Sequence, residues 1–268
     1  MSEQKVSLSN QAARANEEQA VPAAEVPLPS QGLVYAVGSP LHGKESLQIK
    51  AMTAKEEDIL TSRALLKSGK ALDTLLRSCV LEKDIDLDSL LTGDRNALLV
   101  SIRITGYGAD YKVATECPAC GEKAEHEFDL SSLEIKRLGA EPAALGTNEF
   151  SFALPVSKKT VKFKLLTGAD EKDLSTTIDR MRKLSGGLES VITTRLMTQI
   201  TSVDGESDKG KLSSLIRNMH ARDSRELRGY MDKISPGVNM NQLFSCPSCK
   251  EESVVEVPMG TEFFWPKA

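Results

Sequence analysis

Two Cys-Pro-x-Cys sequences constrain this chain more than any other feature. Cys117-Pro118-Ala119-Cys120 and Cys246-Pro247-Ser248-Cys249 each place two thiols in one tight turn. Two such pairs can supply the four ligands of a closed structural zinc site, which leaves no open position for a substrate. Residues 121–245 separate the pairs, so a shared ion would join distant parts of the chain. We therefore predict one structural Zn ion, bound by Cys117, Cys120, Cys246 and Cys249.

The rest of the composition favours metal ligation over other uses of these cysteines. The 268 residues contain no apolar run long enough for a membrane span, and the polar start is not typical of a signal peptide. We therefore expect a reducing cytoplasm, where paired cysteines bind zinc more often than they form disulfides. A redox Cys-x-x-Cys would open a helix after a buried strand, whereas both pairs here lie between predicted strands. The fifth cysteine, Cys79, follows a Leu-rich stretch and is expected to be an inert core thiol.

The chain also contains an internal repeat that its composition does not reveal. Asp94 precedes Cys117 by the same 23 residues that separate Asp223 from Cys246. Further matches are Leu98 with Leu227, Gly108 with Gly237 and, at an offset of 114 residues, the strand and threonine of 47–53 with those of 161–167. Chance similarity is the alternative for any single match. The ordered series favours duplication, and we predict that each copy donates one cysteine pair to a metal on a pseudo-twofold axis.

Local signals predict an α+β fold of two pseudo-repeated helix-plus-hairpin units joined by a four-cysteine zinc ribbon. Thr53 and Glu56 form a capping box for one helix, and Asp94 is expected to cap another. Helices are predicted at 53–67, 71–81, from 94, at 170–184, 189–200 and 211–234, and strands at 47–52, 112–115, 125–130, 150–154, 161–166, 242–245 and 253–257. The predicted divisions are an extended or disordered N-terminal arm (1–28), a first unit (29–140) and a second unit (141–268).

No residues suggest catalysis. The three histidines, His42, His126 and His220, do not have ligand spacing, and we find no nucleophile elbow, phosphate-binding loop or metalloprotease motif. We therefore predict no enzymatic activity and no small-molecule substrate. The net charge of −4 gives no overall attraction to nucleic acid or to an anionic membrane.

Two further segments are candidates for partner contacts. Arginines between Arg217 and Arg228 form the only basic cluster, diluted by acidic residues, and predict a solvated helix face or a partner contact. Phe263, Phe264 and Trp265 make the C-terminal end unusually apolar. These aromatic residues either pack into the core or anchor the chain to a partner.

Together these features resemble a zinc-ribbon-containing baseplate protein family of contractile-tailed (myovirus-type) bacteriophages. The resemblance covers about residues 28–266, and its most distinctive parts are the Leu-Pro-Ser-x-Gly-x-x-Tyr sequence at 28–35 and the Phe-Phe-Trp-Pro sequence at 263–266. It also includes the helix start at 52–57, Asp94-Arg95, Tyr107-Gly108, Phe128-Asp129-Leu130 and both cysteine pairs. The resemblance implies a structural component of the virion, placed in the wedge or hub of the tail baseplate, with no enzymatic role.

On this interpretation the protein is made in the host cytoplasm and assembled into the tail baseplate. Its partners are other baseplate or tail proteins, which it holds through a zinc-stabilised scaffold, with the N-terminal arm and the aromatic end as contacts. The alternative is a zinc-ribbon module that binds nucleic acid or acts in transcription. Acidic residues beside both cysteine pairs argue against phosphate contact; these are Glu116, Glu122, Glu125, Glu251 and Glu252.

Overall fold

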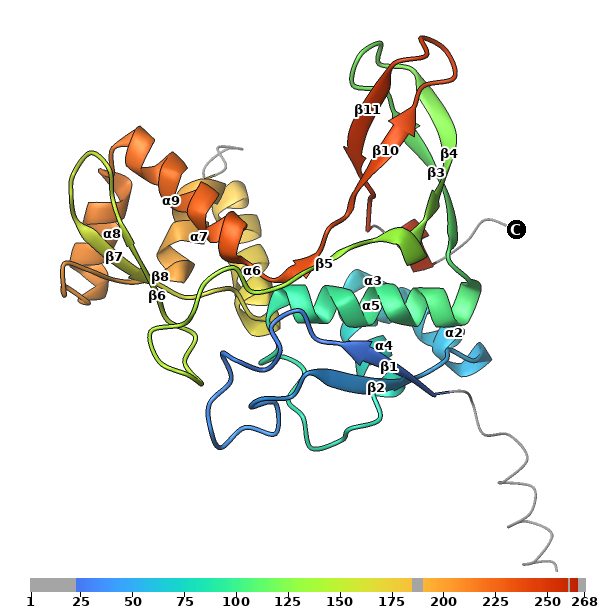
Figure 1. Ribbon diagram of the computed structural model, residues 1–268, viewed down its shortest axis with the longest axis horizontal. Helices are drawn as coiled ribbons and strands as arrows, with labels where there is room; N and C mark the ends of the chain where they lie inside the picture. Colours follow the sequence, from blue (N-terminus) through green and yellow to red (C-terminus); the bar gives the residue numbers. More distant parts are fainter. Residues whose placement is uncertain (1–22, 185–189, 260, 265–268) are drawn as a thin grey trace, which may run out of the picture.

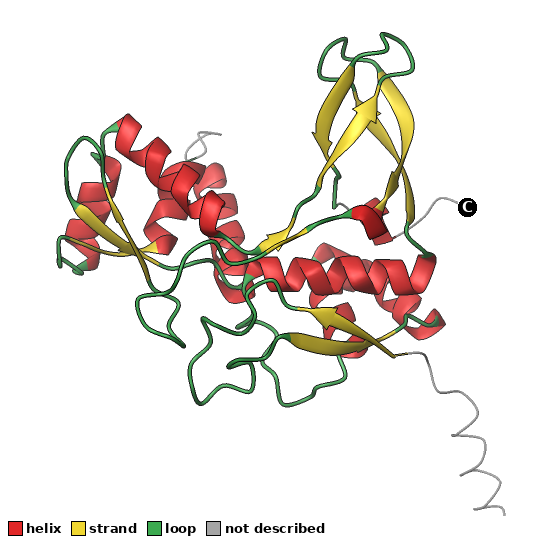
Figure 2. Cartoon of the chain, in the orientation of Figure 1, coloured by secondary structure: helices red, strands yellow, loops and turns green. Residues whose placement is uncertain are grey.

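The computed structural model describes residues 23–184, 190–259 and 261–264, which form an α+β fold of helices and small antiparallel sheets (Figures 1 and 2). Two helical bodies lie side by side, and two long β-hairpins project together from them at the top of Figure 1. Among the described residues, no helix is long and apolar enough to cross a membrane.

The first body contains one hairpin and a set of helices. Its elements are β1 (Ala23–Pro27), β2 (Ser46–Lys50), α2 (Ala54–Thr61), α3 (Arg63–Lys67), α4 (Ala71–Cys79) and α5 (Thr92–Tyr107). Val26 of β1 pairs with Leu47 of β2, and both side chains are buried. Val80, directly after α4, adds an isolated bridge to Ile49 of β2. Helix α5 contacts both strands through its apolar face, which supplies much of the core.

The second body also begins with two paired strands that are followed by helices. Its elements are β6 (Phe150–Ala153), β7 (Thr160–Phe163), α6 (Gly168–Leu184), α7 (Val191–Gln199), β8 (Ile200–Val203), α8 (Lys209–Arg217) and α9 (Ala221–Ile234). Phe152 of β6 pairs with Val161 of β7. Ile200, directly after α7, pairs with Phe163 and begins the third strand of this sheet.

The projecting hairpins are β3 (Asp110–Glu116) with β4 (Lys123–Asp129), and β10 (Asn241–Ser245) with β11 (Glu252–Glu256). Between them and the bodies lie the short pair β5 (Ile135–Lys136) and β9 (Gly237–Val238) and the 3-10 turns η1 (Leu130–Ser132) and η2 (Thr261–Phe264). Each hairpin follows the last helix of one body, so the hairpins are the continuation of α5 and α9.

The helix after each body's first hairpin begins with the same polar arrangement. The Thr53 N–H and hydroxyl both donate to the Glu56 carboxylate, which also accepts from the Lys50 ammonium at 2.7 Å. In the second body Thr167 donates to Asp170 in the same way, and the Lys164 ammonium binds Asp170 at 2.6 Å. A carboxylate at this position accepts from the N–H of the threonine that precedes the helix. Its negative charge is also favourable at the positive end of the helix dipole.

A buried carboxylate then connects the long helix of each body to a preceding loop. Asp94 of α5 accepts from the Ser30 N–H at 2.9 Å and from the Ser30 and Tyr35 hydroxyls. Asp223 of α9 accepts from the backbone N–H groups of Val156 and Ser157, at 2.7 and 3.0 Å. Both carboxylates are fully buried, so these donors replace the water that each lost on folding.

Several sequence predictions are corrected by these contacts. Asp94 does not cap its helix, because α5 begins at Thr92 after Leu91 and Asp94 binds a distant loop instead. The helix predicted at 211–234 is interrupted between α8 and α9, with the His220 side chain accepting from the Arg222 N–H. The predicted helix at 53–67 breaks at Ser62, which caps α3.

The N-terminal division also differs from the prediction. Residues 23–27 of the expected arm form β1 in the core of the first body, because Val26 and Leu28 find apolar partners there. The strands β1 and β8 were not expected from the sequence, since the first is short and the second directly continues α7. Residues 1–22 of the predicted arm lie outside the described residues.

The Glu56 carboxylate should make the first body sensitive to acid. Burial alone would raise the pKa of Glu56, but hydrogen bonds from Lys50, Ser78 and Thr53 outweigh it and hold the pKa at about 2. A carboxyl whose pKa is lower in the folded state stabilises the fold above its unfolded pKa. We expect about 3 kcal/mol of stability to be lost as the pH falls from about 4.5 towards 2.

Glu56→Gln tests this expectation by urea denaturation across that pH range. The variant should be less stable than the wild type at pH 7, and the difference should shrink as the pH approaches 2. Asp58→Asn, at an exposed position of the same helix, is the matched control and should follow the wild type. Equal pH profiles for Glu56→Gln and Asp58→Asn would contradict the assigned role.

Candidate metal centre

Each cysteine pair lies in a turn at the tip of a projecting hairpin. In the first turn the Cys117 N–H donates to the Glu122 carbonyl at 2.9 Å, and the Gly121 N–H donates to the Cys117 carbonyl at 2.9 Å. In the second, Cys246 and Lys250 make the equivalent bonds, each 3.0 Å long. Gly121 and Lys250 both have left-handed backbone angles, with φ values of 74° and 63°. The two turns therefore have the same closed backbone, which points both thiols of a pair the same way.

The four thiols meet where the two tips come together. The Sγ atoms of Cys117 and Cys249 are 3.7 Å apart, and those of Cys120 and Cys246 are 3.8 Å apart. All four sulfur atoms lie within 4.8 Å of one another. A tetrahedral ion with metal–sulfur bonds of about 2.3 Å requires sulfur–sulfur distances of about 3.8 Å. The donor set therefore fits one tetrahedral metal ion, with one buried and one exposed cysteine from each hairpin.

Local electrostatics also favours a thiolate in this cluster. Backbone N–H groups of Cys249 and Ser248 lower the pKa of the Cys246 thiol to about 7. Four adjacent thiolates would repel one another strongly without a cation, so the arrangement suits a soft divalent metal. Cys79 is different, because burial in the core raises the pKa of its thiol to about 11. As predicted, it is a core thiol, and it lies away from the cluster.

An aromatic contact joins the hairpins below the cysteines. The His126 ring of β4 lies 4.6 Å from the Phe128 ring and 5.1 Å from the Phe244 ring of β10, both edge to face. Phe244 is fully buried and packs with Cys117, Cys246 and Val255. His126, one of the three histidines without ligand spacing, is half-buried and bridges the hairpins. The sequence alone did not indicate this role, because the contact partner lies far along the chain.

The segments that leave the hairpins cross over to the opposite body. After the first hairpin, Ile135 pairs with Val238, and the Gly139 N–H donates to the Ile234 carbonyl of α9 at 2.9 Å. After the second hairpin, the Tyr111 hydroxyl of β3 donates to the Pro258 carbonyl at 3.2 Å. Each body is therefore contacted by the segment that leaves the other body's hairpin.

Arg103 of α5 fixes the end of the second crossing segment. Its guanidinium donates to the carbonyls of Phe263 at 2.7 Å, Gly108 at 2.7 Å and Asp110 at 3.1 Å. The side chain is almost fully buried, and it also lies over the Tyr107 ring, 5.3 Å from its centre. A planar guanidinium can satisfy three carbonyls at once, which a lysine cannot do with the same geometry.

The structure describes two of the three aromatic residues at the C-terminal end, Phe263 and Phe264. Phe263 and Phe264 are fully buried, and the Phe263 ring packs against the Tyr111 ring at 5.1 Å. Of the two roles considered for these residues, packing into the core is the one observed. The Phe264 ring packs edge to face against the Phe263 ring, at 5.0 Å. Trp265, the third predicted contact residue, lies outside the described residues.

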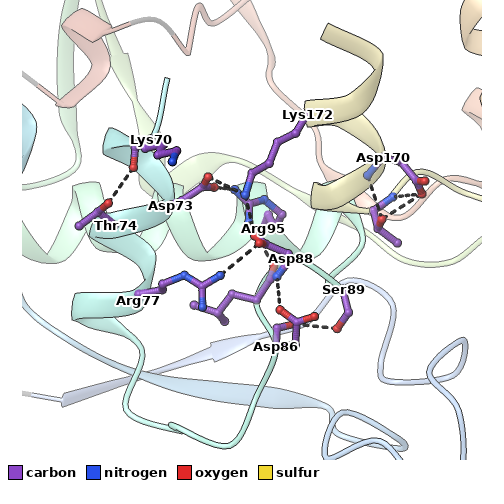
Figure 3. A network of polar contacts seen from close by, with 12 residues as sticks. Lys70, Asp73, Thr74, Arg77, Asp86, Asp88, Ser89, Arg95, Asp170 and Lys172 are labelled. Atoms are coloured by element: carbon purple, nitrogen blue, oxygen red, sulfur yellow. Dashed lines mark hydrogen bonds and ion pairs between the residues drawn. The ribbon is translucent and has the colours of Figure 1, made fainter. Parts of the chain in front are cut away.

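A charged network joins the two bodies (Figure 3). Lys172 of α6 binds Asp73 of α4 at 2.6 Å and Asp88 at 2.7 Å. Arg95 of α5 also binds Asp73, at 2.5 Å, and Arg77 binds Asp88 at 3.1 Å. The bodies therefore contact each other through alternating charges in addition to the crossing segments.

The remaining candidate residues have structural partners. His42 lies 2.7 Å, through its Nδ1 atom, from the Tyr35 carbonyl, and His220 caps α9. The basic segment 217–228 spans the end of α8 and the first half of α9, where Arg217, Arg222 and Arg225 are exposed. This exposure agrees with a solvated face. A role for that face in binding a partner stays a prediction.

The Leu-Pro-Ser-x-Gly-x-x-Tyr sequence has a clear structural purpose. Its serine and tyrosine are the Ser30 and Tyr35 donors to Asp94, and its first residue, Leu28, is buried in the core. Gly32 has a φ of 72°, and a Cβ atom there would lie 2.3 Å from the Lys44 nitrogen. The sequence is therefore needed to close the loop over α5, a function that only the distant Asp94 explains.

Comparison with known families relates part of the chain to bacteriophage baseplate proteins. Residues 35–146 match the family described as T4 bacteriophage base plate protein. The matched segment contains the first body after its loop, the first hairpin and its cysteine pair. The match supports a component of the phage tail baseplate. No curated protein and no solved structure matches the chain.

Replacing Arg103 should destabilise the fold. Arg103→Met keeps much of the side-chain volume but leaves three carbonyl groups without this donor, at about 1–3 kcal/mol for each that stays buried and unsatisfied. We expect a loss of at least about 2 kcal/mol in the free energy of unfolding, measured by urea denaturation. Arg225→Met is the matched control, because the Arg225 side chain is 81% exposed. Equal stability of the two variants would show that Arg103 does not anchor the crossing segment.

Proposed function

We propose that the chain is a structural subunit of the phage tail baseplate in which one zinc ion clamps two copies of a duplicated unit. The family match supports the baseplate role. The convergence of Cys117, Cys120, Cys246 and Cys249 from two hairpins supports the clamp and is the observation that carries the proposal. On this proposal the zinc ion is structural, because four protein ligands leave no position for a substrate.

The duplication rests on contacts that recur at corresponding positions. The polar groups at the helix start correspond, with Lys50, Thr53 and Glu56 matching Lys164, Thr167 and Asp170. The paired strand residues correspond too, with Val26 and Leu47 matching Phe152 and Val161, and Val80 matching Ile200. The buried carboxylate of Asp94 matches that of Asp223. Such agreement in hydrogen bonding and strand register is stronger support than the spacing of single residues. The ion would then lie on the approximate twofold axis that relates the two hairpin tips.

The clamp would fix the position of both hairpins. Each hairpin alone is a two-stranded ribbon, which is marginally stable in water. Structural zinc contributes roughly 10–16 kcal/mol of apparent binding free energy in small zinc-dependent domains, comparable to the net stability of a whole domain. The crossing segments would transmit this stabilisation to both bodies, since each one leaves the clamp and packs on the opposite body.

Metal analysis tests the clamp directly. Protein purified without chelator should contain one zinc ion per chain. Cys249→Ser should lower the zinc content and the thermal midpoint of unfolding, because a hydroxyl is a poor zinc ligand. The control is Cys79→Ala, which removes a thiol outside the cluster and should keep a full zinc content even where its stability falls. Wild-type protein without zinc and with all four cluster thiols freely reactive would disprove the clamp.

The baseplate role is tested by complementation. A phage lacking this gene should form no complete tails unless the protein is supplied, and the supplied protein should then be found in purified tails. We further propose the N-terminal arm and Trp265 as contacts with neighbouring baseplate subunits. Trp265→Ala should keep zinc and stability but reduce the copies of the protein per tail. A protein absent from tails and from their assembly intermediates would contradict the baseplate role and favour the nucleic-acid-binding alternative.

A further inference from the structure

The two projecting hairpins differ on their outward faces, although their inward faces are alike. Leu243 and Val254 are directly paired across β10 and β11, so their side chains share one face. They are 61% and 68% exposed, among the most exposed large apolar side chains of the described residues. The buried Phe244 and the half-buried Val255 alternate with them and face the other hairpin. The outward face of the second hairpin is therefore apolar without being covered by the chain itself.

The corresponding face of the first hairpin is polar. Ala114 and Glu125 pair at the positions that correspond to Leu243 and Val254. Lys112 with Glu127, and Lys123 with Glu116, form ion pairs of 3.7 Å across this face. Since both hairpins have the same backbone and the same cysteine turns, the fold does not require the exposed apolar pair. This difference points to a function specific to the second hairpin.

Charge identifies the chemistry that would fit this face. Glu252 and Glu256 lie on the outward side of β11, on either side of Val254, and neither forms an ion pair with another described residue. Beside Leu243 is an open hollow of about 460 Å³ lined by polar groups that include Glu134, Asn239 and Gln242. Carboxylate and amide oxygens in a hollow of this kind suit the side chain of a lysine or arginine. An acidic face of this kind repels nucleic acid and anionic lipid.

We propose that the outward face of β10 and β11 is a docking surface for a neighbouring baseplate protein that presents an apolar patch bordered by lysine or arginine. The proposal rests on the baseplate role proposed above. Leu243 and Val254 form the apolar centre of the contact, and Glu252, Glu256 and Glu134 recognise the basic border. Apolar centres with charged borders are typical of protein interfaces, in which a few central side chains dominate the affinity. The metal clamp positions this surface at the far end of the projection.

The test uses the gene-deleted phage, supplied in turn with wild-type protein and with variants. Leu243→Thr combined with Val254→Thr keeps two residues that favour strands but removes the apolar surface. We expect this double variant to keep its zinc content and thermal midpoint and to show at least a tenfold loss in copies per purified tail. The matched control is Ala114→Thr combined with Glu125→Thr, which makes the same final pair on the first hairpin and should be incorporated like the wild type.

A second variant pair tests the charge. Glu252→Gln combined with Glu256→Gln should weaken incorporation, and the loss should be smaller when tails are reconstituted at high salt, because screening already weakens the contact there. Normal incorporation of the Leu243/Val254 double variant would overturn the docking surface while leaving the baseplate role intact. Absence of the wild-type protein from tails would overturn the baseplate role itself. If the wild-type protein is a dimer in solution and the Leu243/Val254 double variant is a monomer, the partner is a second copy of this chain and not another baseplate protein.

Discussion

The structure depends on the crossing of two segments beneath the paired hairpins. The charged network also joins the bodies, but the crossing connects each hairpin to the opposite body. Because the segment after each hairpin packs on the opposite body, the two bodies, the hairpins and the cysteine cluster become one connected structure. Arg103 and the buried Phe263 and Phe264 secure one crossing, and the pairing of β5 with β9 secures the other. The position of the four thiols is a consequence of these contacts.

Buried carboxylates perform a second task, which is to attach loops to helices. Burying an unpaired carboxylate costs several kcal/mol, so Asp94 and Asp223 are tolerated only because their loops present donors to them. The solutions differ in detail: Asp94 uses two hydroxyl groups and one backbone N–H, whereas Asp223 uses two backbone N–H groups. The pKa of Asp94 is raised by its burial, while the two backbone donors outweigh the effect of burial and lower the pKa of Asp223. The same position thus tolerates different chemistry as long as the carboxylate is satisfied.

A projection held by a metal clamp would suit the proposed baseplate subunit, which would hold its neighbours at fixed positions. The network of Asp73, Asp88, Arg95 and Lys172 joins the two bodies, and the cysteine cluster lies at the tips of the hairpins. The proposed zinc clamp and the proposed docking surface share the second hairpin, so the same turn that supplies ligands would also present the apolar pair. The proposed duplication would allow such a division of roles, because one copy could keep a polar face while the other changes.

The sequence by itself determined the features that depend on neighbouring residues. Cys-Pro-x-Cys spacing identified the four thiols, and the Thr53 and Glu56 pattern identified a helix start. The strands on either side of each cysteine turn were also predicted. What only the tertiary structure decided was the partner of each long-range group: Asp94 with Ser30, Arg103 with Phe263, and His126 with Phe244. A residue type limits which interactions are possible, but the choice among them depends on which segments folding brings together. For this reason Asp94 suggested a helix cap in the sequence and proved to be a buried anchor, and the aromatic end joined the core.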